Sequence, residues 1–140
     1  MKLFFAFFRR LNLVLYRLSK GRVMGSFDSM PILLLTTRGV KSGKPRTTPL
    51  MFMEENGSYL VVASNAGEDC HPAWYPNLRA APEVTVQVRG DVRRMVASRL
   101  EGEERNQIFE RFKASAKRYA DYESKTSRAI PVVALRPTEG

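Results

Sequence analysis

Short apolar segments bounded by turn residues recur along the chain, and they predict a sheet of short strands. Val84, Val86 and Val88 alternate with polar residues, as in a strand with one buried face. Asn56-Gly57 and Gly90-Asp91 are turn signals that join neighbouring strands into antiparallel hairpins. The predicted strands cover residues 31–38, 47–54, 59–64, 84–88, 92–100 and 130–135.

Apolar residues recur at helical spacing in two later segments. Residues 103–122 carry one apolar face and predict a long helix. Residues 72–80 predict a short helix, in which Pro76 should remove a hydrogen bond and produce a kink or a 3₁₀ turn. Short antiparallel strands with helices between them favour an α+β fold with a closed or partly closed barrel. At 140 residues, one folded domain is expected.

The first 20 residues predict an amphipathic helix with a basic face. Leu and Phe recur at helical spacing, and residues 1–22 hold six Lys or Arg and no acidic residue. The segment is too short and too charged to span a bilayer, and no signal-peptide cleavage site follows it. A helix on an anionic membrane surface and a helix packed on this domain or on a second subunit both fit this pattern. We therefore divide the chain into a basic helix over residues 1–22 and a barrel domain over residues 23–140.

The formal net charge of +9 indicates an anionic partner, such as nucleic acid, a membrane surface or an anionic ligand. Aromatic residues do not interleave with the cations as they do in RNA-binding segments, so nucleic acid is not the expected partner. One cysteine and one histidine exclude an internal disulfide and an ordinary zinc site. This cysteine usage suits a reducing compartment, and we expect a cytoplasmic protein without a metal.

A cationic turn lies between the first two predicted strands. Residues 38–46 contain two glycines and no acidic residue, and their four cations are Arg38, Lys41, Lys44 and Arg46. Such side chains, with the N–H groups of a glycine turn, bind phosphate or carboxylate. A solvated hairpin tip has a similar composition, and the spacing alone leaves both interpretations open. Further along, the aromatic pair Trp74-Tyr75 is compatible with plain core packing.

Several segments in order resemble a known family. LLTTRGVKSGKPRTTPL, VVASNAG and HPAWYPNLRAAPEVTVQV, with YADY and IPVV near the end, are similar to the deazaflavin-dependent nitroreductases. The similarity covers roughly residues 31–131. It implies a split β-barrel like those of flavin reductases and pyridoxamine oxidases, with about six mostly antiparallel strands and flanking helices. It also implies coenzyme F420, an 8-hydroxy-5-deazaflavin, as the cofactor.

The resemblance assigns roles to individual residues. The residues that match the phosphate-holding loop are Lys41, Ser42, Gly43 and Arg46, and the candidates for the anionic glutamate tail are Arg38 and Lys44. The ring would lie between two segments, Pro49, Leu50 and Met51 on one side and Ala63, Ser64, Asn65, Ala66 and Gly67 on the other. The residues expected to close over it are Trp74, Tyr75 and Asn77.

The candidate catalytic residues are Ser64, Tyr119 and Tyr122, which could hydrogen-bond the acceptor or donate a proton. Core packing stays an open role for both tyrosines. The chain departs from the family at three positions. Other members often have Lys where Asn65 stands and Gly where Ala66 stands, and some have Tyr where Ala116 stands.

The function implied by the resemblance is transfer of a hydride from C5 of the reduced deazaflavin to a quinone, enone or nitro-type acceptor. His71 next to Asp69 and Cys70 gives no catalytic triad, so we interpret His71 as a cap or satisfied histidine and Cys70 as structural. A deazaflavin carrier without turnover and a flavin- or haem-binding barrel are the alternatives. An oligomer is compatible with each.

Overall fold

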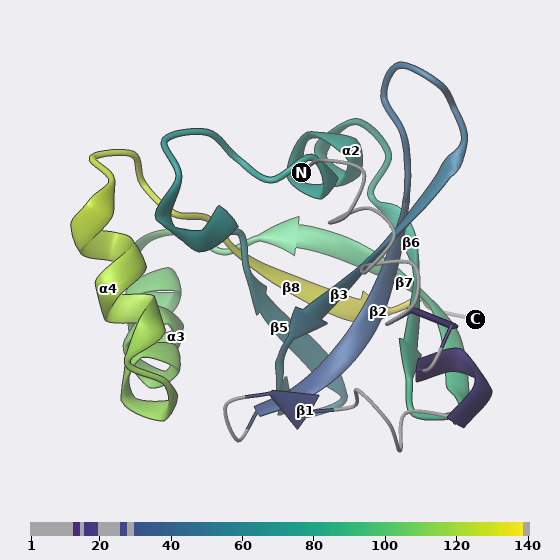
Figure 1. Cartoon of the computed structure of the whole chain (residues 1–140), viewed down its shortest axis with the longest axis horizontal. Coiled ribbons are helices and arrows are strands. Elements are labelled where there is room, and N and C mark those ends of the chain that lie inside the picture. Colours follow the sequence, from purple (N-terminus) through teal and green to yellow (C-terminus); the bar gives the residue numbers. More distant parts are fainter. Residues whose placement is uncertain (1–12, 15, 20–25, 28–29, 139–140) are drawn as a thin grey trace.

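The computed structural model describes residues 13–14, 16–19, 26–27 and 30–138, which form one curled antiparallel sheet with helices beside it and at one end (Figure 1). Residues 13–14 and 16–19 are helical. The other elements are β1 (Ser26–Phe27), β2 (Met30–Arg38), β3 (Pro45–Met51), β4 (Met53–Glu55), β5 (Ser58–Val62), η1 (Asn65–Gly67), α2 (Trp74–Ala80), β6 (Glu83–Val88), β7 (Asp91–Arg99), α3 (Gly102–Ser115), α4 (Arg118–Lys125) and β8 (Val132–Pro137).

The sheet closes on itself through a bent strand. The strand order is β1-β2-β6-β7-β8-β5-β4, and β3 also pairs with β2. Every pairing is antiparallel. Only Phe52 separates β3 from β4. Because β3 pairs with β2 and β4 pairs with β5, this continuous segment joins the two sides of the sheet and closes the barrel. With β3 and β4 taken as one bent strand and the short β1 set aside, the predicted split β-barrel of about six strands is confirmed.

Alternation along the strands creates two hydrophobic cores. In β5, Tyr59 and Val61 belong to the cluster inside the barrel, which α2 closes at one end. Leu60 and Val62 face the other way and pack with α3 and α4, which lie beside the barrel (Figure 1). β8 divides its side chains between the same two clusters. These strands are therefore apolar on both faces, because successive side chains point to opposite sides of a sheet.

The turn chemistry is present as predicted at Asn56-Gly57. Both residues have positive φ, 52° and 82°, as a two-residue hairpin turn of type I′ requires.

Two predicted elements are divided in the structure. The strand expected over residues 47–54 breaks at Phe52, where the pairing partner changes from β2 to β5. The helix expected over residues 103–122 breaks at Ala116, whose backbone is extended (φ −150°, ψ 119°). No glycine or proline marks this second break. It turns α4 onto η1, and this tertiary contact overrides local helix propensity.

The kink expected at Pro76 is wrong. Pro76 is the third residue of α2, which is a continuous α-helix from Trp74 to Ala80. The first four N–H groups of a helix have no partner within it, so a proline in this turn removes no hydrogen bond.

The described part of the N-terminal helix packs on the barrel. Tyr16 is 1% exposed, and its hydroxyl donates to the carbonyl oxygen of Ile32 (2.9 Å) and accepts from the N–H of Arg89 (2.8 Å). Val14 and Leu18 in the same segment are 49% and 80% exposed. Residues 1–12 of the predicted helix lie outside the described residues, and the boundary at residue 22 stays a prediction. Within the described ranges, no helix is long and apolar enough to cross a bilayer.

Replacing Tyr16 by Phe should destabilise the protein by about 1–3 kcal/mol, because the Ile32 carbonyl and the Arg89 N–H would lose their shared partner. Urea denaturation measures the change. Leu18→Ala is the matched control from the same segment and should stay within about 0.5 kcal/mol of the parent, because its side chain is exposed. Equal stability of Tyr16→Phe and the parent would contradict the docking of this helix.

Candidate functional site

The strand pairing of the barrel has a gap between β3 and the later part of β5, and we call this gap the opening. The two segments predicted to enclose a ring lie on either side of it. β3 pairs with β2 along its whole length and has no second strand partner among the described residues. β5 pairs with β4 only over residues 58–60, so its later residues have β8 alone as a strand partner. In Figure 1, β3 and β5 run in diverging directions. Pro49, Leu50 and Met51 lie on one unpaired edge, and residues 63–67 continue the other.

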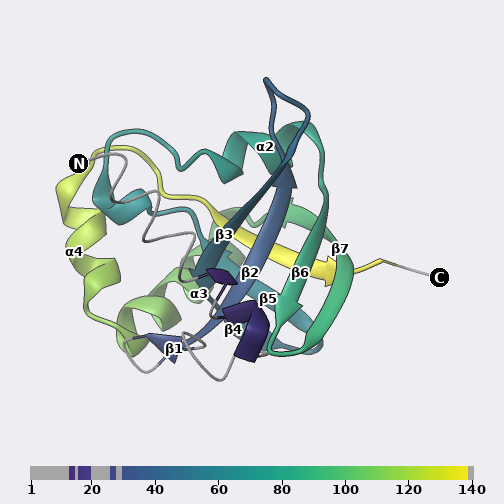
Figure 2. The ribbon, with the colours of Figure 1, turned by 45° about the vertical axis from the view of Figure 1, so that its right-hand side comes forward.

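The cationic turn is the tip of the β2–β3 hairpin, which projects beyond the barrel in both views (Figures 1 and 2). The N–H of Gly39 donates to the carbonyl oxygen of Lys44 (2.9 Å), and the N–H of Gly43 donates to that of Gly39 (2.9 Å). A Cβ at Gly39 would lie 2.8 Å from the Ser42 hydroxyl oxygen, and Gly43 has a φ of 70°. Both positions therefore favour glycine, as the tight turn predicted.

The four cations of this hairpin do not share one face. Arg38 is directly opposite Pro45, whereas Arg46 is opposite Thr37, so the two arginine side chains point to different sides of the strand pair. Lys41, Lys44 and both arginines are exposed, and none of the four forms an ion pair within the described part of the chain. Their charge is therefore available to an anionic ligand on either side of the hairpin.

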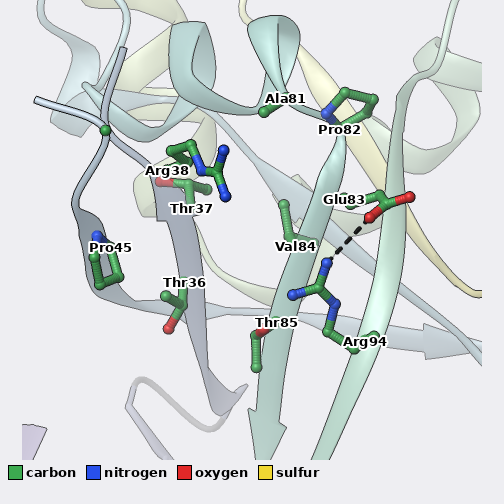
Figure 3. A pocket seen from close by; sticks show the side chains of 11 residues that line it. Thr36, Thr37, Arg38, Pro45, Ala81, Pro82, Glu83, Val84, Thr85 and Arg94 are labelled. Atoms are coloured by element: carbon green, nitrogen blue, oxygen red, sulfur yellow. Dashed lines mark hydrogen bonds and ion pairs between the residues drawn. The ribbon is translucent and has the colours of Figure 1, made fainter. Parts of the chain in front are cut away.

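Arg38 lines a cleft of about 570 Å³ (Figure 3). Thr36 and Thr85 come from the adjacent strands β2 and β6, and Arg94 lies across from Arg38, paired with Glu83 at 3.1 Å. Gly43 is the second predicted residue in this lining, which does not include Lys41, Arg46 or the 63–67 segment. The cleft is thus distinct from the opening between β3 and β5. Its volume is in the range of small-molecule sites.

Asn77 fixes the hairpin to α2. Its amide oxygen accepts from the N–H of Val40 (3.1 Å), and its amide nitrogen donates to the hydroxyl of Thr37 (3.1 Å). The side chain is buried, so these bonds stabilise the position of the cationic turn. The role expected for Asn77, closing over a cofactor, stays a prediction, whereas the clamp on the hairpin is in place.

Trp74 and Tyr75 lie in the interior core rather than on the surface. Both are buried, and their rings meet edge to face at 6.4 Å. The Tyr75 hydroxyl accepts from Arg79 (2.9 Å). Core packing, the simpler interpretation of this aromatic pair, accounts for these contacts. Closure over a ring stays a prediction for both.

Three successive residues of the other flank have left-handed backbone conformation. The φ angles of Asn65, Ala66 and Gly67 are 48°, 54° and 81°. Such a conformation is strained for Ala, costs little for Asn and is free for Gly. The N–H groups of Ser64, Asn65 and Ala66 have no hydrogen-bond partner among the described residues. This turn therefore presents donors to a ligand, as the match to the family's ring-edge turn implied.

Two of the positions that depart from the family, Asn65 and Ala116, have defined surroundings in the structure. The Asn65 amide nitrogen donates to the carbonyl oxygen of Cys70 (3.1 Å) and closes the loop from residue 65 to 70. Cys70 itself is exposed. Ala116 is buried at the break between α3 and α4. A Cβ at Gly67 would lie 3.1 Å from the Cα of Tyr122, so Gly67 permits the close approach of α4.

The candidate catalytic residues are not equivalent. Ser64 and Tyr122 both adjoin the η1 turn, and Tyr122 is half-buried with its hydroxyl 3.4 Å from an Arg118 nitrogen. Tyr119 is 3% exposed and packs edge to face on Phe112 with 5.1 Å between ring centroids. The structure thus favours core packing for Tyr119, while Ser64 and Tyr122 stay candidates for contact with an acceptor.

Arg128 is the residue of this region that sequence reasoning missed. Its guanidinium donates to the carbonyl oxygens of Ala63 (3.2 Å), Ser64 (2.8 Å) and Glu68 (2.9 Å) and lies 3.0 Å from Nδ1 of His71. Burial and the neighbouring Arg128 charge lower the pKa of His71, which suits a neutral ring that accepts this hydrogen bond. The prediction of a satisfied histidine is thereby confirmed. Arg128 lies inside the segment that resembles the family, and no spacing signal links it to residues 63–68.

The fold defines a split β-barrel, and the N–H donors of the η1 turn and the cations of the β2–β3 hairpin suit an anionic cofactor. Within that class, the chain belongs to the F420H(2)-dependent quinone reductase family, which matches residues 8–137. A curated F420H(2)-dependent quinone reductase of Mycobacterium tuberculosis is 37% identical over 132 residues, which cover 90% of this chain and 87% of that protein. The expected deazaflavin family and its F420 cofactor are confirmed at this level.

Two solved structures are similar to this chain in both fold and sequence. An F420-H2 dependent reductase has a TM-score of 0.69 and 47% identity and covers 76% of this chain and 94% of its own. A second structure, described as a domain-swapped dimer, has a TM-score of 0.72 and 39% identity. The match covers 94% of this chain and 98% of that one.

Replacing Ala66 by Gly should stabilise the protein by up to about 1 kcal/mol, because Gly relieves the left-handed strain and this gain exceeds its entropy cost in the unfolded chain. Thermal unfolding measures the change. Ala114→Gly, at an exposed position in α3, is the opposite control and should destabilise by about 0.5–1 kcal/mol. A loss of stability in Ala66→Gly as large as in the control would show that the turn is not strained.

Proposed function

We propose that this protein oxidises reduced coenzyme F420 and transfers the hydride to a quinone. The observation that carries the proposal is the presence of two features: a turn whose N–H groups at residues 64–66 have no partner among the described residues, and a hairpin whose four cations form no ion pair there. A ring with polar edge atoms and an attached phosphate needs both kinds of partner. The family and its relatives in Mycobacterium tuberculosis support the same acceptor class.

The residues present fit this cofactor. Lys41, Ser42, Gly43 and Arg46 would hold the phosphate at the tip of the hairpin, which Asn77 fixes. The N–H groups of the η1 turn would bind the polar edge of the ring. Arg38 faces the 570 Å³ cleft with Arg94 opposite, so we propose that the anionic glutamate tail binds there, with Lys44 as a second candidate contact. These assignments spread the cofactor's negative charges over both faces of the hairpin.

When bound, the reduced cofactor supplies a hydride from C5 of the deazaflavin. The protein orients the reacting groups and excludes water from the opening. A quinone gains a hydride and a proton in this reaction, and Ser64 and Tyr122, which adjoin the turn, are placed to hydrogen-bond its oxygen or to pass the proton. Tyr119 would act through Tyr122, since their rings lie 6.0 Å apart and Tyr119 is buried.

For the whole protein we propose a cytoplasmic location with peripheral contact to the inner face of the membrane. Val14 and Leu18 point away from the barrel while Tyr16 anchors the helix, which leaves an apolar pair beside a strongly basic segment. A quinone acceptor dissolved in the bilayer would suit this location. An oligomer is supported by the structural neighbour described as a domain-swapped dimer.

The purified protein should oxidise reduced F420 with menadione as acceptor, and Lys41→Ala and Arg46→Ala should each weaken cofactor binding by about 1–3 kcal/mol, because each removes a charged hydrogen bond to the phosphate. Absorbance gives the turnover, and fluorescence titration gives the affinity. Arg93→Ala is the control, since Arg93 is an exposed cation on β7 that already pairs with Asp91.

Cofactor binding without oxidation by any quinone, enone or nitro compound would instead support a carrier. Unchanged affinity in both loop variants would contradict the phosphate assignment. Tighter binding of FMN or haem than of F420 would favour the other barrel class.

Val14→Asp/Leu18→Asp should abolish co-sedimentation with vesicles that contain anionic phosphatidylglycerol and leave cofactor affinity unchanged. The double variant keeps Tyr16, which deletion of residues 1–20 would remove together with its bonds to the barrel. Val92→Asp, at an exposed valine of β7, is the matched control and should sediment like the parent. If the parent protein does not sediment with the vesicles, the membrane proposal is wrong.

A further inference from the structure

One guanidinium group, that of Arg128, forms hydrogen bonds to four residues of the loop from residue 63 to 71. Arg128 comes from the segment between α4 and β8, and its Nη2 atom donates to two successive carbonyl oxygens, those of Ala63 and Ser64. Its Nε donates to the carbonyl oxygen of Glu68, and its Nη1 donates to His71 Nδ1. Four hydrogen bonds of one planar group thus converge on nine residues of chain. A lysine, whose three donors share one nitrogen, cannot reproduce this fork.

The direction of these bonds determines where the free N–H groups point. The N–H of Ala63 donates to the carbonyl oxygen of Pro131, next to β8, so this side of the Ala63 backbone faces β8 and Arg128. In a trans peptide unit, the C=O and the following N–H point in opposite directions. The N–H of Ser64 therefore points to the other edge of β5, the edge that leads to β4 and β3.

Ser64 itself has helical backbone angles (φ −77°, ψ −30°), which turn its carbonyl oxygen back toward Arg128. The N–H of Asn65, which belongs to the same peptide unit as this oxygen, is then directed away from Arg128 as well. Two donors that have no partner among the described residues consequently face the opening between β3 and β5. Both peptide units that carry them are fixed by the same Nη2 atom.

We infer that Arg128 is a positioning residue for the cofactor: it aims the Ser64 and Asn65 N–H groups at the ring from the opposite side of the turn. Its positive charge lies behind two peptide dipoles whose N–H ends face the ring, and a charge in this position strengthens those donors for a negatively polarised ring edge. Arg128 does not itself touch the cofactor. The inference rests on the proposed function only for the identity of the ligand.

A second set of bonds holds the same loop without contacting these peptides. The Thr126 hydroxyl donates to the Asp69 carboxylate (2.8 Å) and accepts from the N–H of Arg128 (3.2 Å). Loss of the Thr126 hydroxyl should loosen the loop near residue 69 and one main-chain contact of Arg128, but it removes none of the side-chain donors on Ala63 and Ser64. Thr126→Val therefore separates general support of the loop from orientation of the two N–H groups.

Arg128→Lys should raise the dissociation constant for F420 by about tenfold or more, because the charge remains but the charge-assisted fork is lost. Thr126→Val should change it by less than about threefold. Arg105→Lys is the matched control: Arg105 also donates to one backbone carbonyl, that of Ile130 (2.7 Å), and makes no hydrogen bond to residues 63–71 within the described part of the chain. Fluorescence titration gives the constants, and thermal unfolding of each variant without cofactor shows the fraction folded.

A readout without cofactor tests the geometry directly. The N–H groups of Gly67 and Glu68 donate to the carbonyl oxygens of Ser64 and Asn65 within the turn, and their amide hydrogen exchange should accelerate in Arg128→Lys. Parental exchange at these amides, parental affinity in Arg128→Lys, or an equal loss of affinity in Arg105→Lys would each overturn the inference.

Failure of the parent protein to bind F420 would contradict the proposed function and would leave the exchange experiment to decide the role of Arg128. If Arg128→Lys does not fold, Arg128→Gln in the same exchange and titration experiments replaces it, with the same outcomes.

Discussion

The change of pairing partner at Phe52 is the constraint on which the rest of the structure depends. Up to Met51 the chain pairs with β2, and from Met53 it pairs with β5, so a single residue carries the sheet around the barrel. The N–H of Phe52 still donates to the carbonyl oxygen of Pro31 (3.1 Å), while its ring packs edge to face on Tyr59 inside the barrel. Away from this point, β3 and β5 share no partner strand among the described residues, and the proposed site lies between them.

The two flanks of the opening are supported by different parts of the chain. The hairpin depends on the side-chain amide of Asn77 in α2, and the η1 turn depends on Arg128 and on the close approach of α4 at Gly67. Each flank thus has its own anchor behind it. The groups that would bind a ligand are the N–H donors of the η1 turn and the cations on the two faces of the hairpin. The residues that hold these segments are Asn77, which is buried, and Arg128, which is half-buried. Such an arrangement keeps the donors oriented before any ligand arrives.

The sequence predicts those features that depend on neighbours in the chain. Apolar runs bounded by turn residues identified the long strands, alternation identified residues 84–88, and Asn56-Gly57 identified its turn, because these signals act over a few residues. The strand break at Phe52 and the helix break at Ala116 depend on tertiary contacts, and neither is marked by a glycine or a proline in the sequence. Arg128 is 65 positions from Ala63, so no spacing rule could join them. The resemblance located both flanks of the site, whereas their supports appear only in three dimensions.

The anchor of the hairpin has a consequence for how such a protein can change. Asn77 holds the turn through the main-chain N–H of Val40 and the hydroxyl of Thr37, and none of the four cations takes part. Charge at the tip can therefore be added, removed or relocated during evolution or engineering at little cost to folding. Affinity for an anionic ligand and the integrity of the barrel become separately adjustable properties, a modularity that most binding loops embedded in a core lack.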